Sequence, residues 1–517
     1  MAATRRADLD TTADCERFRL RGFVDDLVAA GEVEIVDEPT PLSRLAARLD
    51  GNPRTVLFRR AGPEGAEVVG NVMGSRARVA RAFGTDERGL TAEFRRRLAD
   101  PIPPVEVPAS AAPVQAVVKT GDDADLTALP AHLQHDADGA PYISASLDFA
   151  RDPQHGGTNV GIRRMMLRGR REAGVDLNAP SDLRAIYGRA REDSDRIPVA
   201  FAIGAHPADY VAAMAQMPPM DEYAILGALR GAPVPVVRAV TCDLLVPADA
   251  EYVLEGYFDA RGWVEPEGPY GEYVGYYGRL KRNPVFHLTA VTHRRDALFQ
   301  TMTISGRTLA LTDTAQLSGL RTELSVWQAL ESAIREPVAV HATPACGGMY
   351  NVRISMRPRY PGEARNAIAA AFGSTADAKH VFVVDDDIDV FSHDQMDWAL
   401  ATRFQADRDL VVSSGYRAVP LDPSLGGART GAKAGFDLTM PPGAREREYA
   451  VPEPPVYRQV PRRTAAEALA AGPQTFRALM EAAGSDDGRE IVREIESLAA
   501  AGRIERDDDG RYRLKTG

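Results

Sequence analysis

A proline-rich segment limits how this chain of 517 residues can fold more than any other part of it. The segment reads Pro101-Ile-Pro-Pro-Val-Glu-Val-Pro108. Proline restricts its own backbone angle and has no N–H to donate, so this run predicts a linker without regular structure. The length allows about three domains of ~150 residues. We therefore expect separate folding units on the two sides of the linker.

The pattern of apolar and polar residues changes at this linker. Before it, Glu16–Ala30 has helical periodicity, and Glu32–Asp37 alternates polar and apolar residues as a strand does, which predicts an α/β domain over residues 1–115. After it, short β-rich runs such as Val285–Val291 recur between glycines and prolines. This second pattern predicts a sheet-like or barrel-like domain over residues 116–307.

The C-terminal half predicts three further parts. Residues 308–335 have the apolar periodicity of a connecting helix, and strands such as Val338–Ala342 alternate with helices to give a second α/β domain over 336–445. Residues 462–517 read as two helices and a hairpin that turns at Asp507-Asp-Asp-Gly510, a winged-helix-like tail. Mixed charges on its second helix and aspartates at its turn argue against DNA binding.

Composition excludes several classes of function. Lys and Arg total 62 against 73 Asp and Glu, a net charge of −11, which disfavours nucleic acids and anionic membranes as partners. Cys15, Cys242 and Cys346 form no CxxC pair, which argues against a zinc ribbon or a disulfide framework. No apolar targeting segment follows Met1, and no uncharged apolar run approaches the ~18 residues of a membrane span. We expect a cytoplasmic protein.

The most informative motif is the turn Glu265-Pro-Glu-Gly-Pro-Tyr-Gly-Glu272. Glycine and proline make the middle of this segment turn, so Glu267 and Glu272 are held by one rigid element. Two carboxylates in different surroundings can serve as acid and base, whereas an isolated acidic turn is more often just solvated. Apolar and aromatic residues near the two carboxylates favour the acid and base interpretation over a solvated turn: Trp263, Tyr270, Tyr273, Val274 and Tyr276.

Two other segments carry weaker signals. In Gly156–Met166, Asn159 offers a hard oxygen donor, and only one of Arg163 and Arg164 can face inward if the segment is a strand. An inward arginine would clamp a carboxylate or phosphate in two-pronged fashion. The glycine-rich stretch Leu425–Ala434 departs from a P-loop, but a flexible loop there could bring Lys433 to a phosphate.

These motifs occur together in an order that resembles the UbiD family of prenylated-FMN-dependent decarboxylases, which includes ferulic acid decarboxylase. The matching segments are Thr158–Arg164, Met217–Glu222, Val246–Gly256, Glu267–Glu272 and Lys433. The resemblance covers roughly residues 16–440. It implies a mixed α/β fold (α+β) with an N-terminal α/β domain, a central flavin-reductase-like split β-barrel that binds prenylated FMN, and a C-terminal α/β oligomerisation domain. The winged-helix-like tail lies outside the family core.

The resemblance also implies a reaction. Decarboxylation of an α,β-unsaturated or (hetero)aromatic acid leaves a carbanion that no side chain can delocalise, so a cofactor must act as electron sink. In the family the prenylated flavin bonds covalently to the substrate, CO2 leaves, and an acid protonates the product in a reversible reaction. The family's Glu–Arg–Glu catalytic set corresponds to Glu267, Arg164 and Glu272, with Glu272 as the proton donor.

The family further implies binding residues for the cofactor and its ions. Its metal, Mn²⁺ (or Mg²⁺), is held by Asn, His and Glu, with K⁺ nearby. Asn159 and Glu222 match two of these ligands, and Asp182 stands where the histidine is expected, which leaves the metal's identity open. The implied cofactor-binding residues are Asn159, Val160, Gly161, Ile162, Arg163, Arg164, Ser181, Asp182, Met217, Pro218, Glu222 and Lys433.

The expected partners are a small carboxylic acid as substrate, a flavin prenyltransferase as cofactor supplier, and further copies of the chain in a homodimer or homohexamer. Two alternatives stay open. One is an oxidoreductase that binds plain FMN. The other is a non-catalytic UbiD-like subunit, in which Asp182 would mark lost cofactor binding, although retention of Arg164, Glu267 and Glu272 weighs against it.

Overall fold

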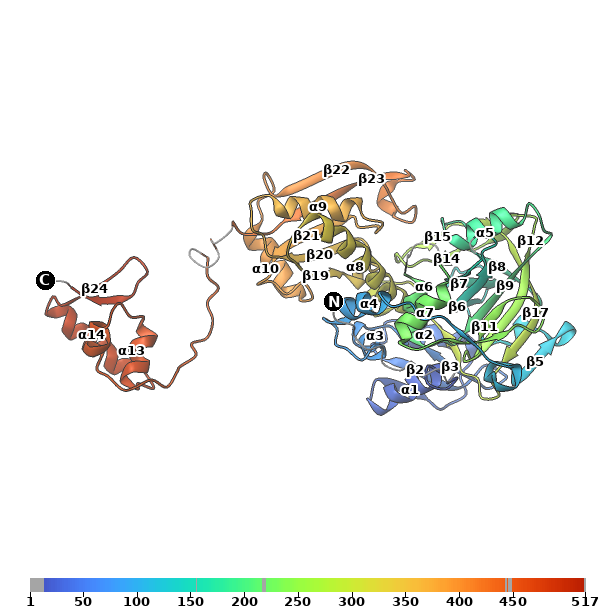
Figure 1. The fold of residues 1–517 in the computed structure, drawn as a ribbon, viewed down its shortest axis with the longest axis horizontal. Helices are drawn as coiled ribbons and strands as arrows, with labels where there is room; N and C mark the ends of the chain where they lie inside the picture. Colours follow the sequence, from blue (N-terminus) through green and yellow to red (C-terminus); the bar gives the residue numbers. More distant parts are fainter. Residues whose placement is uncertain (1–13, 155, 216–219, 442–443, 445–448, 516–517) are drawn as a thin grey trace, which may run out of the picture. The chain divides into compact units, whose positions relative to one another are not determined.

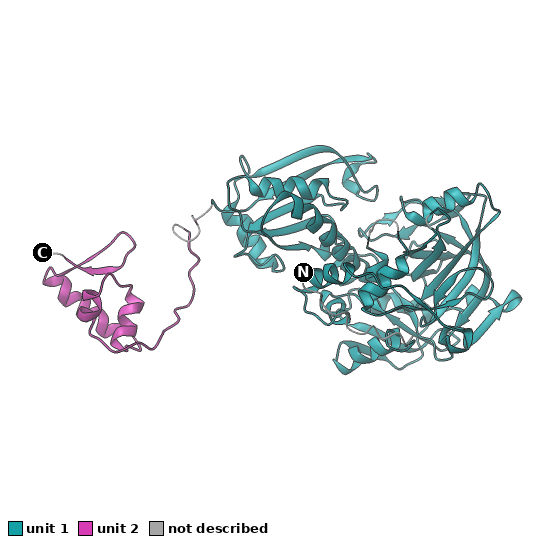
Figure 2. Ribbon diagram, viewed as in Figure 1, with its two compact units in different colours: residues 1–442 teal, residues 443–517 magenta. Residues whose placement is uncertain are grey.

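The computed structural model describes residues 14–154, 156–215, 220–441, 444 and 449–515. It divides into two compact units, residues 1–442 and 443–517 (Figure 2). Unit 1 has the predicted mixed α/β architecture and contains a closed β-barrel (Figure 1). Among helices of the described residues, none combines the length and apolar character needed to cross a bilayer.

The N-terminal part is a four-stranded sheet in the order β1-β2-β3-β18. Its strands are β1 Val33–Val36, β2 Thr55–Ala61, β3 Ala66–Gly70 and β18 Phe299–Thr301. The helices of this part are α1 Leu20–Ala29, α2 Leu45–Leu49, α3 Arg76–Ala82 and α4 Leu90–Leu98. The sheet takes its last strand from beyond the barrel, because β18 pairs in parallel with β3. No local sequence pattern indicated this long-range pairing.

The barrel consists of six antiparallel strands in the order β12-β9-β6-β7-β8-β17, closed by pairing between β12 and β17. Its strands are β6 Tyr142–Arg151, β7 Thr158–Leu167, β8 Glu172–Val175, β9 Arg196–Ile203, β12 Tyr252–Asp259 and β17 Val285–His293, and β5 Val117–Thr120 extends β17. Alternate residues face different cores: Val199 and Phe201 lie in one apolar cluster, Ala200 and Ala202 in another.

Helices α5 Asp182–Ala190, α6 Pro207–Ala213 and α7 Glu222–Arg230 connect the barrel strands. The prediction of a linker without regular structure over residues 101–108 is wrong at one point. Val105–Glu106 form the short strand β4, which pairs with β10 Pro235–Arg238 beside β11 Leu245–Pro247. The flanking prolines confine this strand to two residues, and tertiary pairing stabilises what local propensity disfavours.

The C-terminal part of unit 1 begins with α8 Asp313–Ala333, the connecting helix predicted from the sequence. Its five-stranded sheet has the order β19-β20-β21-β23-β22. The strands are β19 Pro337–Ala342, β20 Asn351–Met356, β21 His380–Asp385, β22 Leu410–Arg417 and β23 Thr430–Asp437. Val381 and Val383 pack with α8 and α9 Glu363–Gly373, and Phe382 on the other face packs with α10 His393–Arg403.

Glu323 of α8 joins the N-terminal part to the C-terminal sheet. Its fully buried carboxylate accepts hydrogen bonds from Arg76 Nη1 and Nη2 at 2.8 and 2.9 Å and from the backbone N–H of Ala342 at 3.1 Å, and lies 3.2 Å from His341 Nδ1. Burial alone would raise the pKa of Glu323, but Arg76 and His341 outweigh it and hold the pKa at about 2. Ionised Glu323 therefore stabilises the fold.

Replacing Glu323 by Gln is expected to lower the free energy of unfolding by ~3–5 kcal/mol at neutral pH, because buried Arg76 loses its counter-charge. The ordinary carboxyl pKa of 4.5 falls to about 2 on folding, so this stabilisation is full above pH 4.5 and is lost as the pH falls towards 2. Urea unfolding at pH 7 and at successively lower pH measures the difference. Glu331→Gln, at an exposed site on the same helix, is the control and should leave stability nearly unchanged.

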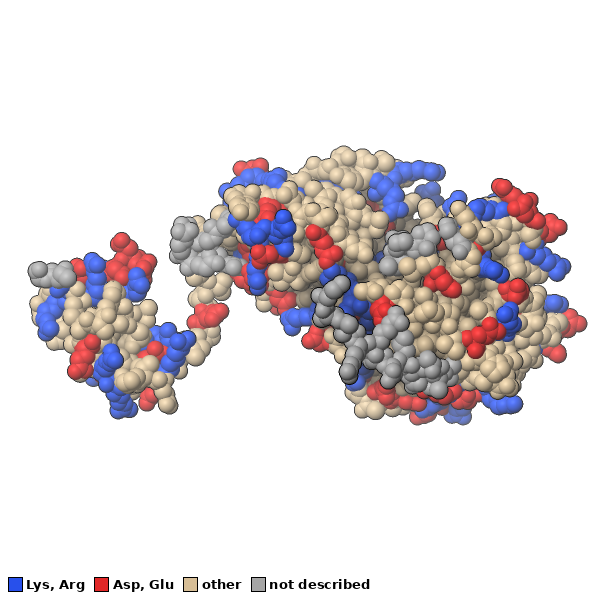
Figure 3. Space-filling model, viewed as in Figure 1, with Lys and Arg blue, Asp and Glu red and all other residues tan. Residues whose placement is uncertain are grey.

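Over residues 449–515, the structure of unit 2 has three helices and a hairpin, one helix more than the sequence predicted for this tail. They are α12 Ala465–Ala470, α13 Phe476–Ala483, α14 Arg489–Ala500, β24 Ile504–Arg506 and β25 Tyr512–Leu514. The additional helix α12 begins with a capping box formed by Thr464 and Glu467. Figure 3 shows charges of both signs interspersed on the visible face of this unit, unlike the basic surface of a DNA reader.

Candidate active site

Arg164 lies on β7 opposite an irregularity in the neighbouring strand. Met165 pairs with Ile143 and Arg163 with Ser146, so two residues of β6 face Arg164 alone. Such bulges bend a strand and redirect side chains, and they are frequent beside active sites. Arg163 and Arg164 point to opposite faces, as the alternation of a strand requires. Arg164 is thus the arginine that faces the turn Glu267–Glu272.

The guanidinium of Arg164 is bonded to three carboxylates at once. Nε donates to Glu267 Oε1 at 3.0 Å and Nη2 to Glu267 Oε2 at 3.2 Å, while Nη1 donates to Glu272 Oε2 at 2.9 Å. Nη2 also donates to Asp176 Oδ2 at 2.9 Å, and the group lies 4.4 Å from the centre of the Tyr270 ring. Planar, two-pronged pairing of this kind fixes both partners in direction as well as distance.

The two glutamates differ in their surroundings. Glu267 is fully buried and also accepts hydrogen bonds from Tyr142 Oη at 3.0 Å and from Asn283 Nδ2 at 3.3 Å. Burial, with the charge of Glu267, raises the pKa of Tyr142, which keeps this hydroxyl a donor. Glu272, only 3% exposed, receives Lys281 Nζ at 3.0 Å on its second oxygen. Only Glu272 therefore contacts a titratable ammonium group.

Glycines allow the turn to hold these carboxylates. Gly268 has φ of 96°, a left-handed conformation that other residues rarely adopt. Gly278, opposite Tyr270 in the β14–β15 pair (Tyr270–Gly271 and Tyr277–Gly278), leaves room for Glu272, because a Cβ at this position would lie 2.5 Å from Glu272 Oε1. Gly268 within the turn and Gly278 opposite it thus let the backbone hold the two carboxylates.

Asp176 and Lys281 join this cluster although the sequence analysis did not single them out. Asp176 follows β8, whose Val175 pairs with Met165, so it lies across from Arg164. Lys281 pairs with Glu267 across the short ribbon of β13 Glu265–Glu267 and β16 Lys281–Asn283. Burial opposes the charge of Lys281, yet attraction to Asp176 and Glu272 raises its pKa. A hairpin that turns near Gly275 places Lys281 opposite Glu267, and recognising this hairpin in the sequence would have identified Lys281 as a site residue.

Of the aromatic residues expected around the turn, Tyr270 is buried against Arg164, whereas Tyr276 is 60% exposed. Trp263 lies elsewhere, with its ring against Tyr187. The expected crowding of the carboxylates is therefore supplied in part by Tyr142 of the barrel wall, which no local motif indicated.

A second polar group lies at the start of β7. Asn159 Nδ2 donates to Asp148 Oδ2 at 3.1 Å, and Arg163 Nη2 donates to Ser181 Oγ at 3.1 Å. Gly161 approaches closely, since a Cβ there would lie 2.7 Å from Asp148 Oδ1. That buried oxygen lies 3.4 Å from Nε of Arg163, and the two groups form an ion pair. Asp148 therefore joins Asn159 and Arg163 in one polar group at this end of the strand.

Two helices begin beside this group, α5 after its cap Ser181 and α7 after its cap Asp221. Asp182 and Glu222 are their first residues, and the backbone N–H of Val160 donates to Glu222. Burial, with the charges of Asp148 and Asp182, raises the pKa of Glu222 to about 8. Val160 and Ile162 lie between these residues on β7 and provide backbone rather than side-chain groups.

This donor set fits a hard divalent cation in its chemistry, because such an ion prefers oxygen ligands and neighbouring carboxylates repel one another until a cation joins them. Asn159 is buried, Glu222 is half-buried and Asp182 is exposed. Asn159, Asp182 and Glu222 are the residues that would hold it, beside Asp148. Among residues whose positions are described, no three His, Cys, Asp or Glu side chains converge as a ready-made metal site. Met217 and Pro218, expected beside Glu222, lie outside the described residues.

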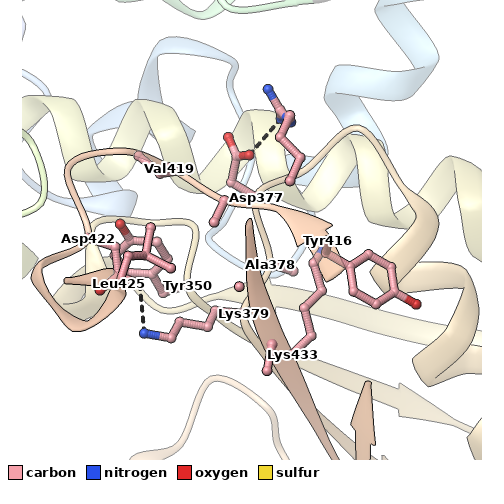
Figure 4. Close-up of a pocket in the computed structure, with 13 residues that line it drawn as sticks. Tyr350, Asp377, Ala378, Lys379, Tyr416, Val419, Asp422, Leu425 and Lys433 are labelled. Atoms are coloured by element: carbon pink, nitrogen blue, oxygen red, sulfur yellow. Dashed lines mark hydrogen bonds and ion pairs between the residues drawn. The ribbon is translucent and has the colours of Figure 1, made fainter. Parts of the chain in front are cut away.

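Lys433 lies on β23 of the C-terminal sheet, so the prediction of a flexible loop at this residue is wrong. Its Nζ donates to the carbonyl of Phe372 at 2.9 Å and lies 5.0 Å from the Tyr416 ring centre. Burial lowers the pKa of Lys433. It lines a cavity of about 30 Å³ that Lys379, paired with Asp422, also borders (Figure 4). These contacts all belong to the C-terminal part, and its role towards a phosphate stays a prediction.

The main cluster is equipped for one kind of chemistry. A buried arginine can bind a substrate carboxylate, and two glutamates in unlike surroundings can divide the roles of charge partner and proton donor. The class defined by this arrangement is an enzyme that acts on a small anionic acid.

Comparison with known proteins identifies the family. Three models of the 3-octaprenyl-4-hydroxybenzoate carboxy-lyase match the chain in succession: the N-terminal domain over residues 25–98, the Rift-related domain over 105–308 and the C-terminal domain over 315–438. An anhydromevalonate phosphate decarboxylase of Methanosarcina mazei is 30% identical over 426 residues, 81% of this chain and 95% of that protein.

Solved structures agree with this result. The UbiD-class enzyme HmfF of Pelotomaculum thermopropionicum in complex with FMN is 34% identical with a TM-score of 0.79, over 84% of this chain and 97% of that one. An evolved dimeric form of HmfF with prFMN is 32% identical, with a TM-score of 0.75 over 82% and 95%. Apo 3,4-dihydroxybenzoic acid decarboxylase (AroY) of Klebsiella pneumoniae is 28% identical, with a TM-score of 0.78 over 85% and 98%. The chain belongs to the UbiD family and is a carboxy-lyase.

Proposed function

We propose that this protein catalyses the reversible decarboxylation of an α,β-unsaturated or (hetero)aromatic carboxylic acid with prenylated FMN as cofactor. The observation that carries the proposal is the simultaneous pairing of half-buried Arg164 with Glu267 and Glu272 in a chain of the UbiD family. The prFMN complex of HmfF supports the choice of cofactor. When bound, this flavin supplies the electron sink that the departure of CO2 requires.

The protein's residues divide the remaining work. Arg164 binds and orients the substrate carboxylate, and Glu267, held by Tyr142 and Asn283, keeps the guanidinium in place. Loss of CO2 leaves an electron pair on the carbon, and Glu272 delivers a proton to that carbon as general acid. One proton is consumed in each turnover, as R–COO⁻ and H⁺ become R–H and CO2. A general acid of this kind contributes ~10²–10⁴-fold to the rate.

We assign the start of β7 to the cofactor and its ions. Asn159, Asp182 and Glu222 are the proposed ligands of Mn²⁺ (or Mg²⁺), with K⁺ nearby, and Val160–Arg163, Ser181, Met217, Pro218 and Lys433 are the proposed flavin-binding residues. The raised pKa of Glu222, caused by burial and by the charges of Asp148 and Asp182, supports a cation here. Asp182 gives the site one more negative charge than a histidine would.

We further propose a cytoplasmic homodimer or homohexamer that receives its cofactor from a flavin prenyltransferase. Exposed apolar side chains on the C-terminal part support self-association through this region: Val338, Tyr360, Trp398 and Val412. The evolved HmfF structure is dimeric. The three free cysteines are consistent with a reducing compartment. Light scattering during gel filtration measures the oligomer directly.

The first experiment is native mass spectrometry, with a visible spectrum, of protein produced with and without a flavin prenyltransferase. We expect prenylated FMN and a divalent ion only in the first preparation. Release of CO2 is then measured with aromatic, heteroaromatic and acyclic unsaturated acids, including 3,4-dihydroxybenzoic acid and a phosphorylated unsaturated acid, because relatives are named for such substrates. Plain FMN with NAD(P)H oxidation would contradict the proposal in favour of an oxidoreductase, and an empty, inactive protein in favour of a non-catalytic subunit.

A further inference from the structure

Lys281 occupies a special place in the active-site cluster, between Asp176 and Glu272. Its Nζ donates to Asp176 Oδ2 at 2.9 Å and to Glu272 Oε1 at 3.0 Å. Arg164 contacts the same two carboxylates, so the four side chains form a closed ring of alternating charge. The side chain of Lys281 is 25% exposed and that of Glu272 only 3%, so the lysine is the ring's most solvent-accessible member.

The two glutamates differ in the positively charged groups that stabilise their ionised form. Glu267 is bonded to Arg164, which stays charged at any working pH, and to neutral Tyr142 and Asn283. Glu272 is bonded to Arg164 and to an ammonium group that can lose its proton. A positive charge within about 4 Å favours a carboxylate over a carboxylic acid. Lys281 thus works against the protonated state that a general acid must reach.

Other charged and titratable groups around Glu272 come from every element that packs against it. They are Arg164 on β7, Asp176 after β8, Glu267 on β13, Tyr270 on β14, Tyr273 in the following turn and Lys281 on β16. Tyr270 is buried and Tyr273 is half-buried, and burial raises the pKa of both, which keeps them neutral. Asp176 and Lys281 are therefore the groups whose replacement changes the charge near Glu272 while Arg164 and Glu267 stay in place.

We propose that Lys281, held by Asp176, is a positioning residue that sets the pH at which Glu272 can carry the proton for the product. The inference rests on the proposed function, because it concerns Glu272 as general acid. A general acid acts only while it holds a proton, so activity is lost at alkaline pH. Removing the positive charge of Lys281 makes protonation easier and moves this loss to higher pH. Removing the negative charge of Asp176 makes protonation harder and moves it to lower pH.

The test compares Lys281→Met with Asp176→Asn in holoenzyme made with a flavin prenyltransferase. In each variant the new side chain is similar in size to the one it replaces but carries no charge. The alkaline limb of the kcat profile, with the acid that wild type turns over, should move up by ~1–2 pH units in Lys281→Met and down by ~0.5–1 unit in Asp176→Asn. Lys281→Arg keeps the charge and should stay near wild type. Lys119→Met, on the exposed strand β5, is the control.

A second readout needs no turnover. The protonated carboxyl band of Glu272, assigned in infrared difference spectra against Glu272→Gln, is titrated in each variant. Shifts of opposite sign in the two variants support the proposal, since a general loss of packing would not reverse its direction. Shifts of equal sign, or none, overturn it. If the band shifts as expected while wild type releases CO2 from no acid tested, the proposed function fails and the coupling of Lys281 to Glu272 stands.

Discussion

We expect Glu272→Gln to lower turnover by ~10²–10⁴-fold, while the protein keeps its fold and its flavin. Glutamine is nearly isosteric and retains one carbonyl oxygen for Arg164 Nη1, so the turn and the cluster stay in place. The amide cannot release a proton to carbon, so the final protonation loses its donor. CO2 release and the bound-flavin spectrum, measured on the same sample, separate the chemical effect from loss of cofactor.

Glu265→Gln is the matched control for this variant. Glu265 lies on the same short strand as Glu267, but its side chain is 40% exposed and pairs with exposed Arg261 and with Arg168, which is 14% exposed. Its replacement should leave turnover within about two-fold of wild type, as for other surface charges. Flavin binding with unchanged turnover in Glu272→Gln would refute the role of Glu272 as acid.

Arg164→Ala is expected to reduce activity by at least about 10³-fold and the free energy of unfolding by ~3–5 kcal/mol, because buried carboxylates lose their shared cation. Glu267 is fully buried, Glu272 is 3% exposed and Asp176 is half-buried, which makes the uncompensated charges costly. Urea unfolding and CO2 release measure the two effects on one preparation.

Arg164→Lys separates charge from geometry. A lysine ammonium restores the positive charge, but it cannot reach three carboxylates with a planar fork. Most of the stability should return while activity stays at least about 10²-fold below wild type. Arg170→Ala, at an exposed site paired with Asp125, is the control. Full activity of Arg164→Lys would show that a single positive charge suffices and would contradict the orienting role.

The sequence predicted those parts of the cluster that depend on local rules. Strand alternation separated Arg163 from Arg164, and the glycines and proline of the turn indicated that Glu267 and Glu272 share one rigid element. Asp176 and Lys281 escaped prediction because their positions follow from strand register: Val175 against Met165, and Lys281 against Glu267. Register depends on tertiary pairing, and a shift by one residue would turn these side chains to the other face.

In the fold, too, local patterns predicted some elements, whereas others depend on tertiary packing. Periodicity predicted the long helix α8 and strands β19 to β21, whereas β23 looked like a loop because of its glycines and alanines. Gly435 accounts for one of these residues, since a Cβ there would lie 2.3 Å from Ile368 of α9. Close packing of the helix requires glycine where strand propensity would favour a larger residue. Lys433 thereby became part of a strand.

The strand β18 has a consequence for the order in which this protein can fold during synthesis. The N-terminal sheet is complete only when Phe299–Thr301 pair with Val68–Gly70, and those residues leave the ribosome after the whole barrel. The edge of β3 therefore stays unpaired until the barrel strands have been synthesised. We expect a fragment ending at the proline-rich segment to aggregate when it is expressed alone. A fragment that continues through α8 supplies the missing strand and should remain dispersed.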